Sequence, residues 1–142
     1  MKTKTETGFW RSAAIGVLVG IRRHRQERMM AWCRGVFGAM GTGVHERALR
    51  FLEEAVELVQ ALGMTETQAM RVLRYVYSRS PGEPEQELGG VAVTLNTLAD
   101  ACGLLLGECE ENEFRRVQTM PKDVLIKSQR RKANNGIGAE PS

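Results

Sequence analysis

The residues of this chain best suited to chemistry are glutamates that recur at helical spacing. Glu53 and Glu57 lie one helical turn apart and flank an apolar stripe that includes Val56. Like charges four residues apart repel each other, and a cation between them relieves that repulsion. Glu87 shares a helical face with Val91, where an ionised carboxylate is costly unless it is paired or binds a metal. Both stretches therefore carry carboxylates at positions that favour cation binding.

Two antiparallel helices would bring Glu53, Glu57 and Glu87 together as an all-oxygen cluster. Such a cluster suits Mg²⁺, with Mn²⁺ as the alternative, because these hard ions keep several waters and also accept phosphate oxygens. The competing interpretation is that these glutamates lie on ordinary solvated helix faces, which is where most glutamates occur. On spacing alone, solvated faces are the commoner outcome.

Helices must position these side chains, because the alternation typical of strands is nearly absent and the apolar residues recur with a helical period. We therefore expect an all-α fold, a bundle of four to five helices. Local signals support the boundaries: Thr65 and Gln68 form a capping-box pattern, Gly63 suits a helix end, and Pro84 suits a first helical turn. The expected helices cover about 24–37, 44–62, 65–77, 84–106 and 110–132, the last with a break or kink at Pro121.

The length of 142 residues fits one domain. We expect a helical domain over 24–132, between a basic N-terminal segment, 1–23, that is flexible or a short helix, and a disordered tail, 133–142. The only strongly apolar run, 13–21, is far too short to span a bilayer. A basic start precedes this run, as in a signal peptide, but arginines follow it where a small-residue cleavage pattern would be needed.

The formal net charge of +3 hides a separation of charge along the chain. Residues 46–113 are acidic, whereas the segments on either side are basic. This order argues against a plain nucleic-acid-binding protein, which would carry a coherent basic face. Three scattered cysteines exclude a disulfide framework and suggest no zinc site, and free thiols are typical of a cytoplasmic protein.

The segments around the glutamates resemble a known family. ERALRFLEEAVELVQAL, followed by GEPEQELGGVAVTLNTLA, is similar to the all-α nucleoside triphosphate pyrophosphohydrolases of the MazG-like family, in a phage-type form. The family motif is E-x-x-E, a spacer and E-x-x-D. Glu54 and Glu57 match the first half, Glu53 is an additional upstream glutamate, and Glu87 opens the second half. The resemblance covers about residues 26–132.

One position departs from the family motif. Gly90 stands where the second half has its Asp. Asp100 cannot substitute for it on a regular helix, because it points away from Glu87. Glu83, one turn before Glu87, is the better stand-in. The expected metal site is therefore one carboxylate short or is completed by Glu83, which affects metal affinity and turnover rather than the fold.

The resemblance implies Mg²⁺-dependent hydrolysis of a nucleoside triphosphate, expected to be a deoxynucleotide, to the monophosphate and pyrophosphate. Glu53, Glu54, Glu57 and Glu87 would hold the ion, and Glu54 is the expected catalytic residue that orients or deprotonates the attacking water. It also implies a homodimer or homotetramer. The residues expected to contact the phosphates or the base are Arg50, Arg115, Lys122 and Asn96.

Two other functions stay open. One is a nucleotide-binding or interaction protein that keeps the fold and has lost hydrolysis, with Gly90 as its signature. The other is a small helical protein whose arginines at 22, 23, 25 and 28 contact nucleic acid or an anionic membrane surface. That basic run is short, so we expect neither a membrane nor a nucleic acid as the main partner.

Overall fold

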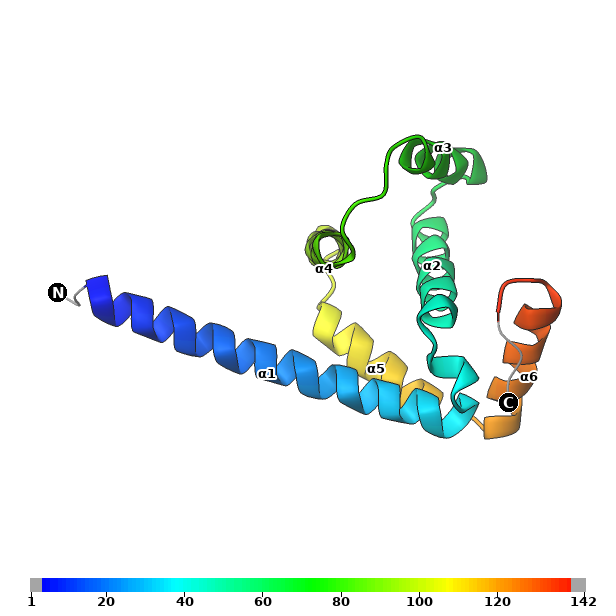
Figure 1. Ribbon diagram of the computed structural model, residues 1–142, viewed down its shortest axis with the longest axis horizontal. Helices are drawn as coiled ribbons and strands as arrows, with labels where there is room; N and C mark the ends of the chain where they lie inside the picture. Colours follow the sequence, from blue (N-terminus) through cyan, green and yellow to red (C-terminus); the bar gives the residue numbers. More distant parts are fainter. Residues whose placement is uncertain (1–3, 139–142) are drawn as a thin grey trace. The chain divides into compact units, whose positions relative to one another are not determined.

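The computed structural model describes the backbone of residues 4–138 and the side chains of residues 12–138. The described residues form helices and connecting turns without a strand, which confirms the expected all-α class (Figure 1). The helices are α1 (Lys4–Phe37), the short 3₁₀ helix η1 (Met40–Thr42), α2 (Val44–Ala61), α3 (Glu66–Tyr77), α4 (Pro84–Ala101), α5 (Leu106–Thr119) and α6 (Lys122–Asn134).

The chain folds into two compact units. The first unit combines the residues up to Arg47 with those from Pro121 onward, and the second unit comprises Ala48–Met120. In the first unit, α1 contacts both η1 and α6. The second unit holds most of α2 together with α3, α4 and α5. The first unit is therefore built from both ends of the sequence.

The ends of α2, α3 and α4 follow from local sequence. The Thr65 hydroxyl accepts a hydrogen bond from the Gln68 backbone, and the Gln68 side chain accepts one from the Thr65 backbone, which confirms the capping box. Gly63 adopts a φ of +88°, a left-handed conformation that suits the residue after a helix. Pro84 occupies the first turn of α4. These helices begin close to where the sequence predicts.

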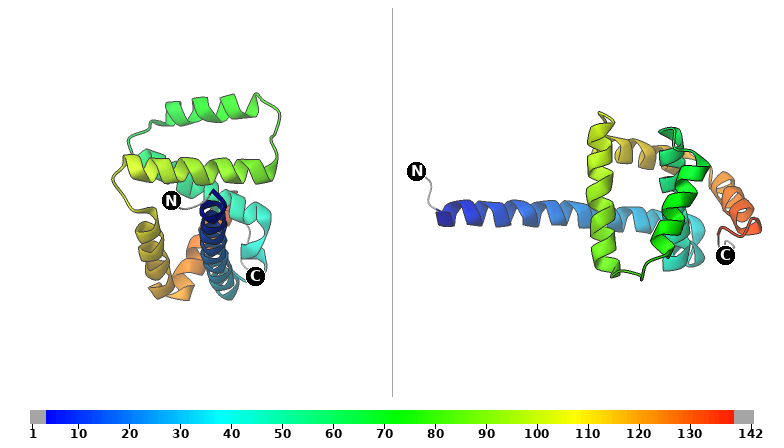
Figure 2. Two further views of the ribbon diagram at one scale, coloured as in Figure 1. Left: turned by 90° about the vertical axis from the view of Figure 1, so that its left-hand side faces the viewer. Right: turned by 90° about the horizontal axis from the view of Figure 1, so that it is seen from above.

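The first and last helices differ from the expectation. α1 begins at Lys4 rather than near residue 24, and the right-hand view of Figure 2 shows it as one uninterrupted helix. Its apolar residues at 13–21 occur in succession and so show no helical period. Pro121 does more than kink the last helix, because it forces Met120 into an extended conformation with ψ of 139°. The expected helix over 110–132 is therefore two helices, α5 and α6.

Two boundaries are also shifted. α4 ends at Ala101, five residues earlier than the expected end near 106. α6 continues to Asn134, so the expected disordered tail begins with helical residues, and a turn follows in which the Ile137 backbone donates to the Lys132 carbonyl over 3.0 Å. Residues 139–142 of that tail and the first three residues of the chain lie outside the described range.

Buried polar side chains join α1, α2 and α6 in the first unit. The Gln129 amide donates to the Glu46 carboxylate over 2.8 Å, and both side chains are buried, with 5% and 3% of their surfaces exposed. Arg47 lies 3.7 Å from the same carboxylate and donates to the Cys33 sulfur over 3.5 Å. We call Cys33, Glu46, Arg47 and Gln129 the polar junction. Its side chains bond mainly to one another, although Nε of Arg47 is buried and has no hydrogen-bond partner among the described residues.

Three further contacts close the first unit around the end of α1. The rings of Trp32 and Phe37 meet edge to face, 6.1 Å apart. Gly41 of η1 is buried directly against the Phe37 side chain. Lys122, at the start of α6, donates to the Gly35 carbonyl over 3.0 Å. The C-terminal end of α1 is therefore held by both η1 and α6.

The second unit leaves much apolar surface uncovered. Among the side chains that the structure describes, Phe114 on α5 is the one apolar side chain that is buried, with 6% exposed. Large apolar side chains on the other three helices of this unit remain exposed; they include Phe51, Leu52 and Val56 on α2, Val72, Leu73 and Val76 on α3, and Leu88 and Val93 on α4. The apolar stripes that the sequence predicts are therefore present on these helices, but their side chains remain exposed to solvent.

Within residues 4–138, no helix taken singly has both the length and the apolar character needed to cross a membrane. α4 and α5 meet that criterion of length and composition only together, as a pair bent by 100°.

Candidate metal and nucleotide site

The first group of predicted ligands consists of Glu53, Glu54 and Glu57, which lie along α2 in the second unit. Glu54 and Glu57 are exposed, whereas Glu53 is partly buried. The Glu53 carboxylate accepts a hydrogen bond from the guanidinium of Arg50, one turn earlier. Arg50 therefore balances the charge of Glu53 within the chain, and Glu54 and Glu57 present their carboxylates to solvent.

Arg116 on α5 is a positive charge that interacts with Glu54. Arg116 donates two hydrogen bonds to Glu113, of 2.7 and 2.6 Å. These bonds and the charge of Glu113 raise the pKa of Arg116, and the negative charge of Glu54 adds a smaller contribution. The neighbouring Arg115, a predicted substrate contact, lies 3.8 Å from Glu111. The charges of Glu54 on α2 and Arg116 on α5 therefore interact.

The second group of predicted ligands stands at the start of α4. Glu83 is the N-cap residue, in an extended conformation, and its side chain makes no capping hydrogen bond. Glu87 lies in the first turn of α4, and its backbone N–H donates to the Glu83 carbonyl over 3.0 Å. The Glu87 carboxylate lies against Gly82, so that a Cβ atom there would be 3.0 Å from its Cδ. Both carboxylates therefore belong to the N-terminal end of α4.

The structure does not gather the predicted ligands into one cluster within a single chain. Among the described residues, no group of three or more His, Cys, Asp or Glu side chains could hold a metal ion. The donor set is all oxygen and carries several negative charges, which is the chemistry that Mg²⁺ requires. The four-carboxylate site over α2 and α4 therefore stays a prediction.

Two predicted substrate contacts are engaged with backbone carbonyls. The Asn96 amide donates to the Ala92 carbonyl over 2.7 Å, one turn earlier on α4. Lys122 belongs to the first unit, where it donates to Gly35. Arg50 and Arg115 lie in the same unit as the glutamates. These two arginines are therefore the better placed of the predicted cations.

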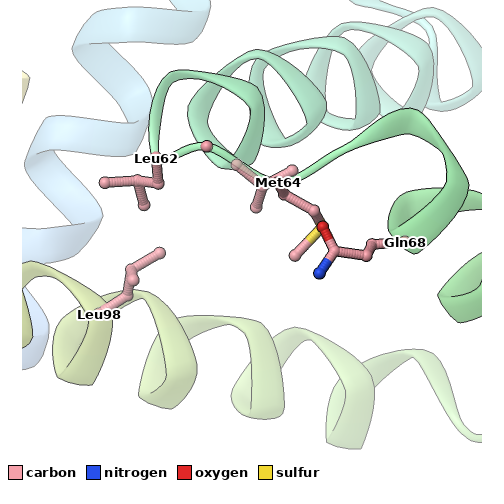
Figure 3. A pocket seen from close by; sticks show the side chains of 6 residues that line it. Leu62, Met64, Gln68 and Leu98 are labelled. Atoms are coloured by element: carbon pink, nitrogen blue, oxygen red, sulfur yellow. The ribbon is translucent and has the colours of Figure 1, made fainter.

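An apolar hollow in the second unit was not expected from the sequence. It has a volume of about 340 Å³, and Figure 3 shows Leu98 of α4 across from Leu62 and Met64, with Gln68 beside them. Leu98 follows Glu87 by three helical turns on the same face of α4. The hollow is thus about 16 Å along that helix from the carboxylate, at a rise of 1.5 Å per residue. The only signal for it in the sequence is the apolar stripe of each helix.

Comparisons with family models, with curated proteins and with solved structures found no match to this chain.

Proposed function

We propose that this chain is a Mg²⁺-dependent nucleoside triphosphate pyrophosphohydrolase of the MazG-like type. The proposed reaction converts a deoxynucleoside triphosphate to the monophosphate and pyrophosphate. One observation carries the proposal: the two halves of the motif lie on two helices of the same compact unit. The three glutamates of the first half are on α2, and the single glutamate of the second half is on α4. The all-helical fold is consistent with it.

In the proposed mechanism, Glu53, Glu54, Glu57 and Glu87 would hold the metal ion, and Glu83 would take the place of the missing Asp. When bound, Mg²⁺ supplies positive charge that offsets the charge of the phosphates. Glu54 accepts a proton from water as the water oxygen attacks the α-phosphorus. The bond from that phosphorus to the bridging oxygen then breaks, and pyrophosphate leaves.

Positive side chains near the carboxylates would bind the phosphate oxygens. Arg50 lies one turn before Glu54, and Arg115 is on α5 next to Arg116, whose charge interacts with that of Glu54. Arginine suits this role because its planar guanidinium can form paired hydrogen bonds to phosphate. Lys122 and Asn96 would first have to leave their backbone carbonyls, so we assign them smaller roles.

We further propose that the active form is a homodimer or homotetramer. The uncovered apolar faces of α2, α3 and α4 support this, because contiguous exposed apolar surface marks a contact region. Sedimentation velocity over a range of protein concentrations tests it. A chain that stays monomeric at every concentration would contradict this part of the proposal.

The decisive experiment is pyrophosphate release from a panel of ribo- and deoxynucleoside triphosphates, with Mg²⁺ or Mn²⁺ and with neither. We expect Glu54→Gln and Glu87→Gln to lower kcat by about 100-fold or more, since each removes a metal ligand or the general base. Glu66→Gln, an exposed glutamate in the first turn of α3, is the matched control and should keep full activity. Equal activity in all three variants would exclude the proposed site.

A second candidate function, nucleotide binding without hydrolysis, is favoured by one observation, Gly90 at the Asp position of the motif. A Cβ atom at Gly90 would meet nothing within 4 Å, so a side chain can begin there without a clash. If the chain binds nucleotides with Mg²⁺ in calorimetry but releases no pyrophosphate, this function holds. Gly90→Asp should then restore measurable hydrolysis, whereas Gly89→Asp, one position earlier with equal space, should not.

A further inference from the structure

The N-terminal half of α1 carries an apolar segment that the described residues of the first unit leave uncovered. Residues 12–21 are all exposed, and Cβ atoms built on Gly16 and Gly20 would meet nothing within 4 Å. Gly35 and Phe37, through which α1 contacts α6 and η1, lie at the other end of the helix. The large apolar side chains of the segment are 52% to 63% exposed; they are Ile15, Val17, Leu18, Val19 and Ile21.

These large apolar side chains spread widely around the helix. At 100° per residue they cover a sector of roughly 200°. The remaining sector holds only small residues, which are Ser12, Ala13, Gly16 and Gly20. A helix that packs on a protein core presents a narrower apolar stripe, of about 100° or somewhat more. The segment is therefore wider in its apolar character than a single partner helix would cover.

The apolar segment continues directly into a basic stretch of the same helix. Arg22, Arg23, Arg25 and Arg28 follow it, and the one acidic residue among them, Glu27, pairs with Arg23 over 3.0 Å. The first unit as a whole has 14 lysines and arginines against 5 aspartates and glutamates, whereas the second unit has 6 against 12. Charge complementarity therefore favours an anionic partner for the first unit.

The combination of apolar and basic surface distinguishes between partners. The phosphates of a nucleic acid would bind the arginines but would leave the apolar side chains in water. A second copy of α1 would cover part of the apolar sector but would bring no negative charge to the basic stretch. A lipid surface with anionic headgroups offers both, because the headgroups attract arginine and the acyl chains accept apolar side chains.

We propose that residues 12–28 of α1 bind the surface of an anionic lipid bilayer. The apolar segment is about 15 Å long, which is half the thickness of the hydrocarbon core. Arginines adjoin it in the sequence on both sides, at 11 and 22. The helix therefore lies along the surface, with its large apolar side chains toward the acyl chains and its small residues toward the headgroups.

This inference departs from the expectation that no membrane is involved. The sequence did not indicate that one helix continues from the apolar segment into the basic stretch and leaves both exposed. The inference is independent of the proposed hydrolysis, because the glutamates of that site belong to the second unit.

Co-sedimentation of the full chain with lipid vesicles tests the proposal. One set of vesicles contains seven parts phosphatidylcholine to three parts phosphatidylserine, and the other contains phosphatidylcholine alone. We expect the chain to sediment with the anionic vesicles, to bind the neutral ones at least 10-fold more weakly, and to be released by added salt. Failure to bind the anionic vesicles, or equal binding to both kinds, would overturn the proposal.

Variants separate the apolar from the electrostatic contribution. Leu18→Gln should weaken binding to the anionic vesicles by about 10-fold or more, because a buried leucine is lost. Leu88→Gln on α4 is the matched control, since Leu88 is 68% exposed and Leu18 is 61% exposed. Arg22→Gln should weaken binding by about 5-fold. Arg71→Gln, an exposed arginine on α3, should not. Circular dichroism checks that each variant keeps its helices, and unchanged binding by a folded Leu18→Gln would overturn the proposal.

The other two partners have distinct outcomes. If α1 pairs with a second copy instead, sedimentation velocity will show association that Leu18→Gln abolishes, and the anionic vesicles will remain unbound. If the partner is a nucleic acid, duplex DNA will bind equally well to wild type and Leu18→Gln, again without vesicle binding. Either result would overturn the proposal.

Discussion

Glu46 and Glu54 lie on the same helix, eight residues apart, and meet opposite surroundings. Glu46 is buried in the polar junction, where Gln129 and Arg47 of the same chain surround its carboxylate. Glu54 is exposed, and its charge interacts with that of Arg116 of α5. The first glutamate contributes to folding with partners from its own chain. The second is available to a ligand from outside, so the same residue type marks structure in one unit and proposed chemistry in the other.

The largest effect on stability is expected at Gly41, in the first unit. Gly41→Ala would place a Cβ atom against the Phe37 side chain, 3.1 Å from its Cγ and even closer to its Cβ, which the backbone holds in place. Overpacking of this kind costs about 1 to 3 kcal/mol. Urea unfolding followed by circular dichroism measures it. Gly43→Ala, whose nearest neighbour would be the Met40 carbonyl oxygen at 3.9 Å, is the control and should change stability little.

The next effect is expected at Glu46. Glu46→Ala leaves the buried Gln129 amide without its acceptor, which costs about 1 to 3 kcal/mol. Glu46→Gln keeps an acceptor oxygen and should cost less. Glu57→Ala, on the exposed part of α2, should be close to neutral in the same unfolding experiment. Equal losses at Glu46 and Glu57 would remove the distinction between the two units.

A smaller effect concerns the thiols. Burial raises the pKa of Cys33 above the ordinary value of 9.0, and the charge of Arg47 offsets part of that rise. Cys33 should therefore react with a thiolate-specific reagent more slowly than the exposed Cys102 and Cys109 at pH 8. The Cys33 thiol therefore stays protonated to a higher pH in the folded state than in the unfolded state. The contribution of Cys33 to stability is thus complete below pH 9.0 and is lost as the pH rises through the higher folded-state pKa. Fast labelling of Cys33 would show that the polar junction is open in solution.

The smallest effect is expected at the exposed Glu113–Arg116 pair of α5. The hydrogen bonds from Arg116 lower the pKa of Glu113 from its ordinary value of 4.5. The stabilisation is therefore present above pH 4.5 and is lost as the pH falls through the lower folded-state pKa. Because the pair is exposed, added salt should weaken it. Thermal melts of wild type and Arg116→Gln between pH 6 and pH 3 measure the difference, and a gap that widens toward pH 3 would contradict this sign.

The sequence was sufficient for the helices whose ends are encoded locally. The capping box at Thr65 and Gln68, the left-handed Gly63 and the first-turn Pro84 each act over a few residues, so one sequence reveals them. α1 was only partly predicted, because its apolar run carries no period from which a helix could be read. The strength of the break at Pro121 was also underestimated.

The contacts between distant segments could not be read from the sequence. Glu46 and Gln129 are 83 positions apart, and nothing in either residue type indicates its partner. The same limit applies to the candidate site. Helical spacing placed Glu53 and Glu57 on one side of α2, but it did not indicate that Arg50 pairs with Glu53 or that Glu87 reaches back to Gly82. Both depend on side-chain rotamers, and the position of Glu87 relative to Gly82 depends also on the connector that contains Pro81 and Pro84.

The first unit is assembled from both ends of the sequence, and this has a consequence for synthesis on the ribosome. A chain emerges from its N-terminus, so α1 leaves the ribosome well before α6, which supplies Gln129 and Lys122. The second unit is continuous in sequence and is complete before the first unit can close. Its apolar helices are then exposed while neighbouring nascent chains on the same messenger present the same surfaces. The proposed assembly with a second copy could therefore begin during translation, before the polar junction has formed.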